Sequence, residues 1–237
     1  MAIFEVTTET WDDPEFWAMV TTAPDHNMLE FSALPESFTI SFARDGAFLS
    51  ISDGAKSYVI GDDSAGAGGD ASLGTPGEFG LFEVITGSDG HDVIDGNDES
   101  DLIDGGAGDD LMDGDMGDDT YNEAPGSDDT ITDSDGLDLI DLSDATTGVS
   151  VDLSAVGAPQ GISPGHTLTI NGTIENLTGS PQDDLLTGNA EDNQIDGGAG
   201  DDSLLGGAGN DNLTGNAGND NIDGGAGTDL VDFSSSG

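Results

Sequence analysis

The sequence predicts an all-β chain, most of which is a solenoid of very short strands. One observation is a nine-residue period that begins at Gly87, is interrupted after residue 132, and returns at residues 179–232, where it runs through six units without an insertion. Another is the large apolar residue at the eighth position of almost every unit, which can stack as an internal ladder. A period this short predicts stacked coils, each held by its neighbours.

The charge of the chain limits what it can bind. Its 237 residues include 50 acidic and two basic ones, for a formal net charge of -48 at pH 7. Such a composition is typical of disorder, and the ordered repeat is what argues against it. Nucleic acid and anionic membranes need a basic footprint and are excluded as electrostatic partners. The charge therefore favours cations as ligands, and the absence of cysteine excludes thiolate metal sites.

Residues 1–80 lack the nine-residue repeat and are predicted to form a small β-rich N-terminal domain with one short helix. Asp12-Asp13-Pro14 is typical of a helix start. Segments 38–43, 47–52 and 55–60 alternate apolar with polar residues and are separated by turn residues such as Asp-Gly, which predicts an antiparallel meander.

The repeats fall into two arrays, at residues 81–132 and 179–237. Between them, residues 133–178 form a connecting segment of period-two strands that either continue or interrupt the solenoid. GLDLIDLSDATTG follows the first array, and GTDLVDFSSSG at the chain end looks like the same element starting again. We therefore expect the second array to continue beyond residue 237.

The units fit the pattern G-G-x-G-x-D-x-U-x, where U is a large apolar residue. This pattern resembles the repeats-in-toxin (RTX) family of secreted bacterial proteins. The resemblance implies a right-handed parallel β-roll that binds calcium, with two nonapeptides per coil and an ion between loops two units apart. Pairing the loops of both arrays in this way gives about seven Ca2+ ions, each with roughly six to eight oxygen ligands.

The residue types suit this chemistry. Glycine is favoured at the first, second and fourth positions because the loop must turn tightly, with some backbone at positive φ, so that its carbonyls converge on one point. The sixth-position Asp is a hard oxygen ligand of the sort calcium prefers. The resemblance implies these metal ligands: Asp92, Asp101, Asp110, Asp119, Asp129, Asp184, Asp202, Asp211, Asp220 and Asp229. The loop glycines that complete the sites are Gly105, Gly106, Gly108, Gly117, Gly197, Gly198, Gly200, Gly206, Gly207, Gly209, Gly215, Gly218, Gly224 and Gly227.

Some units depart from the pattern. Glu99 and Glu191 replace the fourth-position glycine, and Asn193 replaces the sixth-position Asp with the loss of one charge. The Ser180-Pro181-Gln182 loop lacks the glycines and is expected to be a cap. The loops of residues 197–229 are expected to bind most tightly.

Two interpretations without calcium remain to be weighed. A glycine-rich acidic linker would need no apolar residue at every ninth position. A metal-free ordered solenoid would stack carboxylates in adjacent coils, and these repel at close range. We therefore expect the arrays to be unfolded without calcium and folded with it, because a ligand that binds only the folded state adds to its stability.

No catalytic site is predicted, and we do not expect an enzyme. Residues 161–165 fit the G-x-S-x-G motif around Ser163, but a nucleophile elbow needs a strand before it and a helix after it, and a Gly/Pro turn is the simpler interpretation. The three histidines form no H-E-x-x-H motif. Acid pairs such as Asp109-Asp110 recur in successive loops, which indicates a metal scaffold and not one glycosidase site.

The sequence thus predicts an extracellular module that folds on binding Ca2+ and has a structural, adhesive or self-assembling role in a surface layer or filament. The alternative is a folding and secretion module of a larger secreted enzyme or toxin whose catalytic domain lies outside this chain. The start at Met1 favours the first. The resemblance implies type I secretion, and no cleaved N-terminal signal or membrane insertion is predicted. Self-association, an extracellular polysaccharide or the cell surface are the candidate partners besides calcium.

Overall fold

A computed structural model describes residues 82–233, apart from residues 88–90, 98–99 and 124–125, together with five strands before residue 62. The described residues form strands and turns, without a helix among them. None of them therefore belongs to a helix long and apolar enough to cross a membrane. The short helix expected after Asp12-Asp13-Pro14 lies outside the described residues.

The strands form three sheets. In spatial order, the ten-stranded sheet contains β1 (Ala2–Glu5), β2 (Asn27–Glu30), β6 (Phe82–Thr86), β8 (Leu102–Asp104), β10 (Thr120–Asn122), β12 (Leu139–Asp141), β16 (Asn176–Thr178), β18 (Gln194–Asp196), β20 (Asn212–Thr214) and β22 (Leu230–Asp232). The eight-stranded sheet contains β14 (Gln160–Ser163), β15 (His166–Asn171), β11 (Asp129–Thr132), β9 (Leu111–Asp115), β7 (Val93–Asn97), β3 (Thr39–Phe42), β4 (Phe48–Ser52) and β5 (Ser57–Gly61). The four-stranded sheet contains β13 (Ser150–Asp152), β17 (Leu185–Thr187), β19 (Ser203–Leu205) and β21 (Asn221–Asp223).

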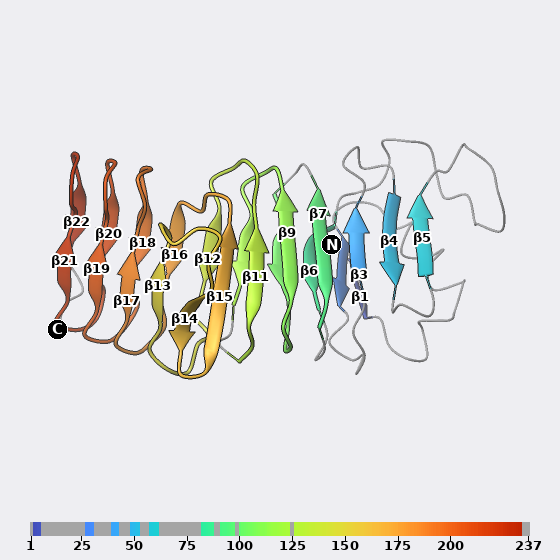
Figure 1. Cartoon of the computed structure of the whole chain (residues 1–237), viewed down its shortest axis with the longest axis horizontal. Helices are drawn as coiled ribbons and strands as arrows, with labels where there is room; N and C mark the ends of the chain where they lie inside the picture. The colour runs from blue at the N-terminus through green and yellow to red at the C-terminus, as the bar shows by residue number, and fades with distance from the viewer. Residues whose placement is uncertain are drawn as a thin grey trace.

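Within the arrays, successive strands alternate between two faces, and each strand pairs in parallel with the strand two units away. Ile195 of β18, for example, pairs with Leu213 of β20. One coil therefore holds two nonapeptides, which confirms the parallel β-roll. Figure 1 shows the coils stacked along the long axis of the molecule, with β21 and β22 at one end.

The ten-stranded and the eight-stranded sheets extend into the N-terminal strands. β2 pairs in parallel with β6, and β3 pairs in parallel with β7. β3, β4 and β5 are antiparallel neighbours, which confirms the predicted meander. The hydrogen bonding of the roll therefore continues across the boundary that the sequence predicts near residue 80.

The connecting segment continues the solenoid on one face and interrupts it on the other. β12 and β16 lie in the ten-stranded sheet between β10 and β18. On the opposite face, the antiparallel hairpin of β14 and β15 ends the eight-stranded sheet, and β13 begins the four-stranded one. The G-x-S-x-G motif lies in this hairpin. Ser163 is followed by a turn with Gly165 at φ +89° and then by β15, so the turn interpretation is confirmed.

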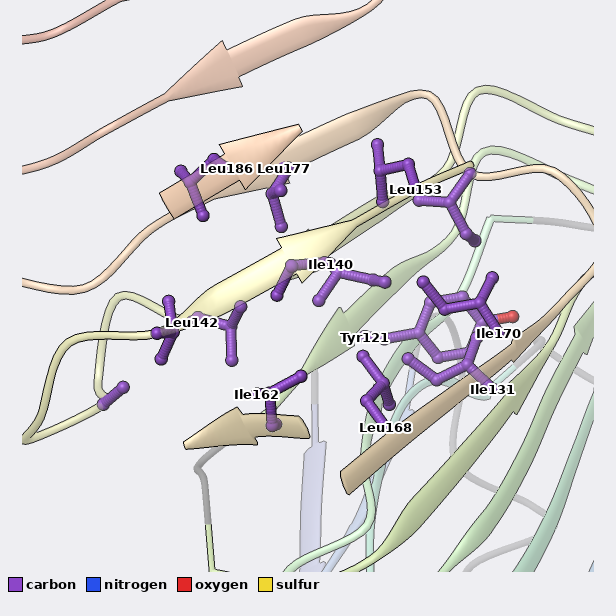
Figure 2. Close-up of a cluster of buried hydrophobic side chains, with 14 of the residues drawn as sticks. Tyr121, Ile131, Ile140, Leu142, Leu153, Ile162, Leu168, Ile170, Leu177 and Leu186 are labelled. Atoms are coloured by element: carbon purple, nitrogen blue, oxygen red, sulfur yellow. The ribbon is translucent and has the colours of Figure 1, made fainter. Parts of the chain in front are cut away.

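The core is the ladder of eighth-position side chains. Figure 2 shows the part of the core around the connecting segment, where Tyr121 and Leu186 of the ladder lie in one cluster with Leu153 and Leu168. Leu204 and Leu213 are 2% and 0% exposed, whereas Leu205, outside the ladder, is 40% exposed. The connecting segment packs further apolar side chains against the ladder, including Leu142, Leu153, Leu168 and Ile174. The roll is therefore held by one or two apolar residues per unit, and the loops between the strands must be stabilised in another way.

Candidate metal centre

The sixth-position carboxylates are buried although they are charged groups. Each lies at the start of a strand of the roll or in the loop just before it. Among the described residues, the buried ones are Asp92, Asp101, Asp110, Asp119, Asp129, Asp184, Asp202 and Asp211. Since buried carboxylates are costly unless they are paired, their partners decide what the loops can do.

In eight of the sixth-position carboxylates, one oxygen is used to join two coils. It accepts a hydrogen bond from the backbone N–H of the sixth-position residue one coil earlier. The donor and acceptor residues are Asp92 and Asp110, Asp101 and Asp119, Asp110 and Asp129, Asp119 and Asp138, Asp184 and Asp202, Asn193 and Asp211, Asp202 and Asp220, and Asp211 and Asp229, at 2.7–3.1 Å. These side chains therefore form ladders along the sides of the roll.

The second oxygen of several of these carboxylates has no partner within the chain. Buried Oδ2 atoms without a hydrogen-bond partner occur in Asp119, Asp202, Asp211 and Asp220. A buried acceptor left unsatisfied costs about 1–3 kcal/mol, and more when it is charged. These atoms are hard, anionic and aimed into the loop, which is the donor chemistry that calcium prefers.

The loop glycines have two different roles. In the glycine-rich loops of the arrays, the glycines at the second and fourth positions have positive φ, as in Gly207 at +106° and Gly209 at +122°. Asn216 and Asp115 take the second position at φ 63° and 73°, which Asn and Asp tolerate better than other residues. The expected positive φ is therefore confirmed at these two positions.

The first-position glycine is required for another reason. Among the described residues, first-position glycines such as Gly206 do not have positive φ. A β-carbon at Gly206 would instead collide with Oδ2 of Asp211, the free oxygen of the same unit. The expectation that all three glycines serve the turn is corrected at this position, because its glycine leaves room for the carboxylate.

Two further acidic positions have structural roles that the sequence prediction missed. The exposed fifth-position Asp201 accepts a hydrogen bond from the N–H of Asn219, one coil further along, at 2.8 Å. The ninth-position Asp196 accepts from the N–H of Gly198, two residues later, at 3.0 Å. The latter contact is an Asx-type turn that caps the loop. Asp at the fifth and ninth positions therefore belongs to the loop scaffold.

Burial dominates the electrostatics of the sixth position. It raises the pKa of Asp110 to about 8, and of Asp119 to about 7. The pKa of Asp202 rises to about 6 by burial, with a further contribution from the neighbouring carboxylates Asp184 and Asp220. Both effects oppose the ionised form, so a divalent cation beside these groups would offset the cost of their charge.

Three sixth positions have local partners that take up their oxygens. Ser180 donates its N–H and its hydroxyl to the two oxygens of Asp184. The hydroxyl of Ser127 donates to Oδ2 of Asp129. Asn193 accepts from the N–H of Asn189 and donates its amide to the carbonyl of Glu175. These three positions are therefore less available to an ion, in keeping with the cap expected at Ser180.

The structure adds a unit that the prediction missed. Residues 133–141 form one unit, which is half of a coil, with Gly136, Asp138 and Ile140 at the fourth, sixth and eighth positions. Asp138 accepts from the N–H of Asp119, and its own N–H donates to Oε2 of Glu175 at 3.0 Å. The signal was present in the sequence, because D-L-I-D at residues 138–141 repeats D-L-I-D at residues 101–104.

The residues present fit calcium. The loops of the second array stack so closely that a β-carbon at Gly218 would collide with the carbonyl oxygen of Gly200, and one at Gly227 with that of Gly209, one coil earlier. Carboxylate and carbonyl oxygens of two coils thus meet at each loop, and nitrogen or sulfur ligands are not needed. The ions would be held by the unpartnered Oδ2 atoms and these carbonyls. The count of about seven ions stays a prediction.

Comparison with known families agrees with this geometry. A family model for the RTX calcium-binding nonapeptide repeat matches four stretches, at residues 86–121, 170–204, 178–213 and 199–231, of which the last three overlap. The matches cover both arrays and omit most of the connecting segment. No curated protein matches the chain significantly.

Proposed function

We propose that this chain, which carries RTX calcium-binding nonapeptide repeats, is an extracellular module that folds on binding Ca2+ and has a structural, adhesive or self-assembling role. One observation carries the calcium part of the proposal. Sixth-position carboxylates such as that of Asp202 use one buried oxygen to join two coils and leave the other without a partner.

Calcium would supply a counter-charge that the repeats themselves lack. From Thr86 onward the chain has no lysine or arginine, so its carboxylates have no basic side chain among the repeats to neutralise them. A cation held by Oδ2 atoms and loop carbonyls of two adjacent coils reduces their repulsion and favours the folded state alone, which couples binding to folding.

This coupling suits a protein exported unfolded and folded outside the cell. Extracellular calcium modules typically bind with Kd values of about 10⁻⁴–10⁻³ M, so they stay empty in a calcium-poor cytosol and fill outside. The repeats are typical of proteins that leave through type I secretion. We include extracellular location and that route in the proposal, together with the absence of catalytic activity.

The structural role is supported by the shape of the roll. Figure 1 shows an elongated stack whose coils repeat along one axis, which presents the same acidic loops many times on its sides. A repeated acidic surface suits calcium-bridged contact with a second copy, an acidic polysaccharide or a cell surface. The alternative is a folding and secretion module of a larger enzyme or toxin.

Sedimentation of the whole chain in calcium and in chelator distinguishes the structural role from the folding-module alternative. The structural role predicts that the chain assembles beyond the monomer in calcium and returns to monomers when the calcium is removed. A chain that folds in calcium and remains monomeric at all concentrations would count against assembly and favour the folding-module alternative.

A further inference from the structure

A row of uncharged side chains runs along the outer face of the ten-stranded sheet. These are seventh-position residues, which point away from the core ladder because side chains alternate along a strand. Each is aligned with the next across β8, β10, β12, β16, β18, β20 and β22 (Figure 1). The seventh-position row, as we call it, consists of Leu102, Thr120, Leu139, Asn176, Gln194, Asn212 and Leu230.

The row is long and accessible. Gln194 and Asn212 are exposed, Leu230 is 65% exposed, and the other members are half-buried. Neighbouring strands of a sheet lie about 4.8 Å apart, so the row extends for ~29 Å along the roll. It passes through the connecting segment without a break, because β12 and β16 belong to the same sheet.

The opposite face lacks a row of this length among the described residues. There the eight-stranded sheet ends at the antiparallel β14, and the four-stranded sheet begins at β13. In the four-stranded sheet, the seventh positions form a shorter row of Ser150, Leu185, Ser203 and Asn221. This shorter row provides matched control positions in the same repeat.

Folding alone does not explain why the seventh-position row has no charge. The ninth-position residues of the same strands alternate acidic with neutral along the sheet: Asp104, Asn122, Asp141, Thr178, Asp196, Thr214 and Asp232. Alternation keeps like charges off adjacent strands, and it would have allowed Asp at the seventh position as well. Moreover, Asp104, Asp141 and Asp196 each accept a hydrogen bond from the N–H two residues later, which ties them to the following loop.

The charge of the chain decides what needs such a row. Two copies, each with a formal net charge of -48, repel one another wherever their acidic loops meet. A row without charge lets them approach, and a two-fold arrangement would place row against row. Asn and Gln amides carry both donors and acceptors, so they can pair across that contact. A neutral sugar polymer, in contrast, would tolerate acids on this face.

We propose that the seventh-position row is the surface through which two copies of this chain pack face to face. The proposal rests on the proposed self-assembling role and assigns that role to one face. A three-residue strand is about 10 Å long, so the contact covers roughly 300 Å² per copy. A standard interface covers about 800 Å² per partner. The pair is therefore expected to be weak and reversible, and to form once calcium has folded the roll and offset part of the loop charge.

Adding a charge without changing shape tests the row. Asn212→Asp places a carboxylate in the row, and in calcium the dissociation constant from sedimentation is expected to rise about tenfold, because the new charges face the row of the other copy. Asn221→Asp is the matched control. It adds the same charge at an exposed seventh position of the four-stranded sheet, and association is expected to stay close to that of the unaltered chain. Circular dichroism should show calcium-dependent folding in both variants.

Disulfide trapping identifies the face directly, since the chain has no cysteine of its own. Asn176 lies at the centre of the row, so in two fully overlapping rows it meets its counterpart whichever way the second row runs. In calcium with copper-catalysed air oxidation, oxygen takes up the electrons and protons of the two thiols. Asn176→Cys is expected to become a disulfide-linked dimer. Ser203→Cys, half-buried in the shorter row, is expected to remain monomeric.

The outcomes separate this surface from the role on which it rests. Equal weakening by Asn212→Asp and Asn221→Asp, or an unlinked Asn176→Cys, in a chain that still assembles would overturn the row as the contact and leave self-assembly standing. An unaltered chain that stays monomeric in calcium at all concentrations would overturn the self-assembling role, and the row with it.

Discussion

The backbone N–H of Asp202 donates a hydrogen bond of 3.1 Å to Oδ1 of Asp220, and Oδ2 of Asp220 has no partner in the chain. One carboxylate therefore serves two purposes at once. Oδ1 fixes the spacing between two coils, while Oδ2 is available to an ion between the loops. This division explains why the sixth position needs Asp: a shorter side chain cannot span the coils, and an amide lacks the charge.

Neutralising one sixth-position carboxylate is predicted to weaken calcium-dependent folding. Asp202→Asn keeps an oxygen that can accept from the N–H of Asp184 but loses the anionic Oδ2. The midpoint of folding in a calcium titration should rise about tenfold, which corresponds to ~1.4 kcal/mol. Circular dichroism measures this midpoint.

The neighbouring residue supplies the control. Asp201→Asn removes the same charge from an exposed side chain whose Oδ1 bond to Asn219 an amide oxygen can replace. Its midpoint is predicted to stay close to that of the unaltered chain. Equal shifts in the two variants would mean that net charge, and not the free oxygen, sets the calcium response.

A β-carbon at the first position is predicted to disrupt the loop without any change of φ. In Gly206→Ala the new methyl group would collide with Oδ2 of Asp211 and with the carbonyl of Gly224. Overpacking of this kind costs about 1–3 kcal/mol. Gly161→Ala is the control, because Gly161 has no positive φ and nothing lies within 4 Å of its β-carbon position.

Urea unfolding in excess calcium compares the two alanine variants. Gly206→Ala should unfold at lower urea than the unaltered chain, and Gly161→Ala at about the same urea. If Gly206→Ala were as stable as Gly161→Ala, the carboxylate beside the first position would not be the reason that glycine is needed there.

Only the buried apolar side chains of the ladder, and not the exposed ones beside it, are predicted to stabilise the roll. Leu213→Ala removes a fully buried side chain from the ladder and should cost about 2–5 kcal/mol in calcium. Leu205→Ala removes a side chain that is 40% exposed and should cost well under half as much. Comparable losses of unfolding free energy would show that the roll is not held by the eighth-position ladder.

The metal-free chain is predicted to be more stable in acid than at neutral pH. Burial raises the folded-state pKa of Asp110 and Asp138 from 3.8 to about 8, and of Asp119 to about 7. A raised pKa contributes stability that is fully present below the unfolded-state value and is lost as the pH rises through the folded-state value. In chelator, strand signal should therefore be greater near about pH 4 than near pH 8. A larger signal at pH 8 would contradict this assignment.

The sequence predicted the repeating part of the fold because the repeat encodes it directly. The eighth-position residues, such as Leu204 and Leu213, form the core ladder, and the glycines of the second and fourth positions have the positive φ that was expected. These features depend on one residue and its own unit, so a nine-residue pattern is sufficient to reveal them.

Features that depend on two units were harder to predict. The bond between the N–H of Asp119 and Asp138 spans a unit with an extra residue, which broke the nine-residue phase and hid the unit at residues 133–141. The contact of Tyr121 with Asp133 likewise joins two units. Neither a motif nor a periodicity reports such contacts, because they are set by how the coils stack.

The fold also shows why the arrays and the connecting segment differ in composition. Val149 and Leu168 are buried at places that align with sixth-position Asp184 and Asp129 of adjacent coils. Apolar side chains there stabilise the coil by burial alone and need no ion. The connecting segment is therefore expected to depend less on calcium than the two arrays.

Far-UV circular dichroism of the whole chain near pH 7.5, in excess chelator and during a calcium titration, tests calcium-dependent folding most directly. The account predicts little strand signal in chelator and a cooperative gain as calcium is added, because the unpartnered carboxylates repel one another until ions bind between the coils. Full strand signal that persists in excess chelator, with no change on adding calcium, would contradict it.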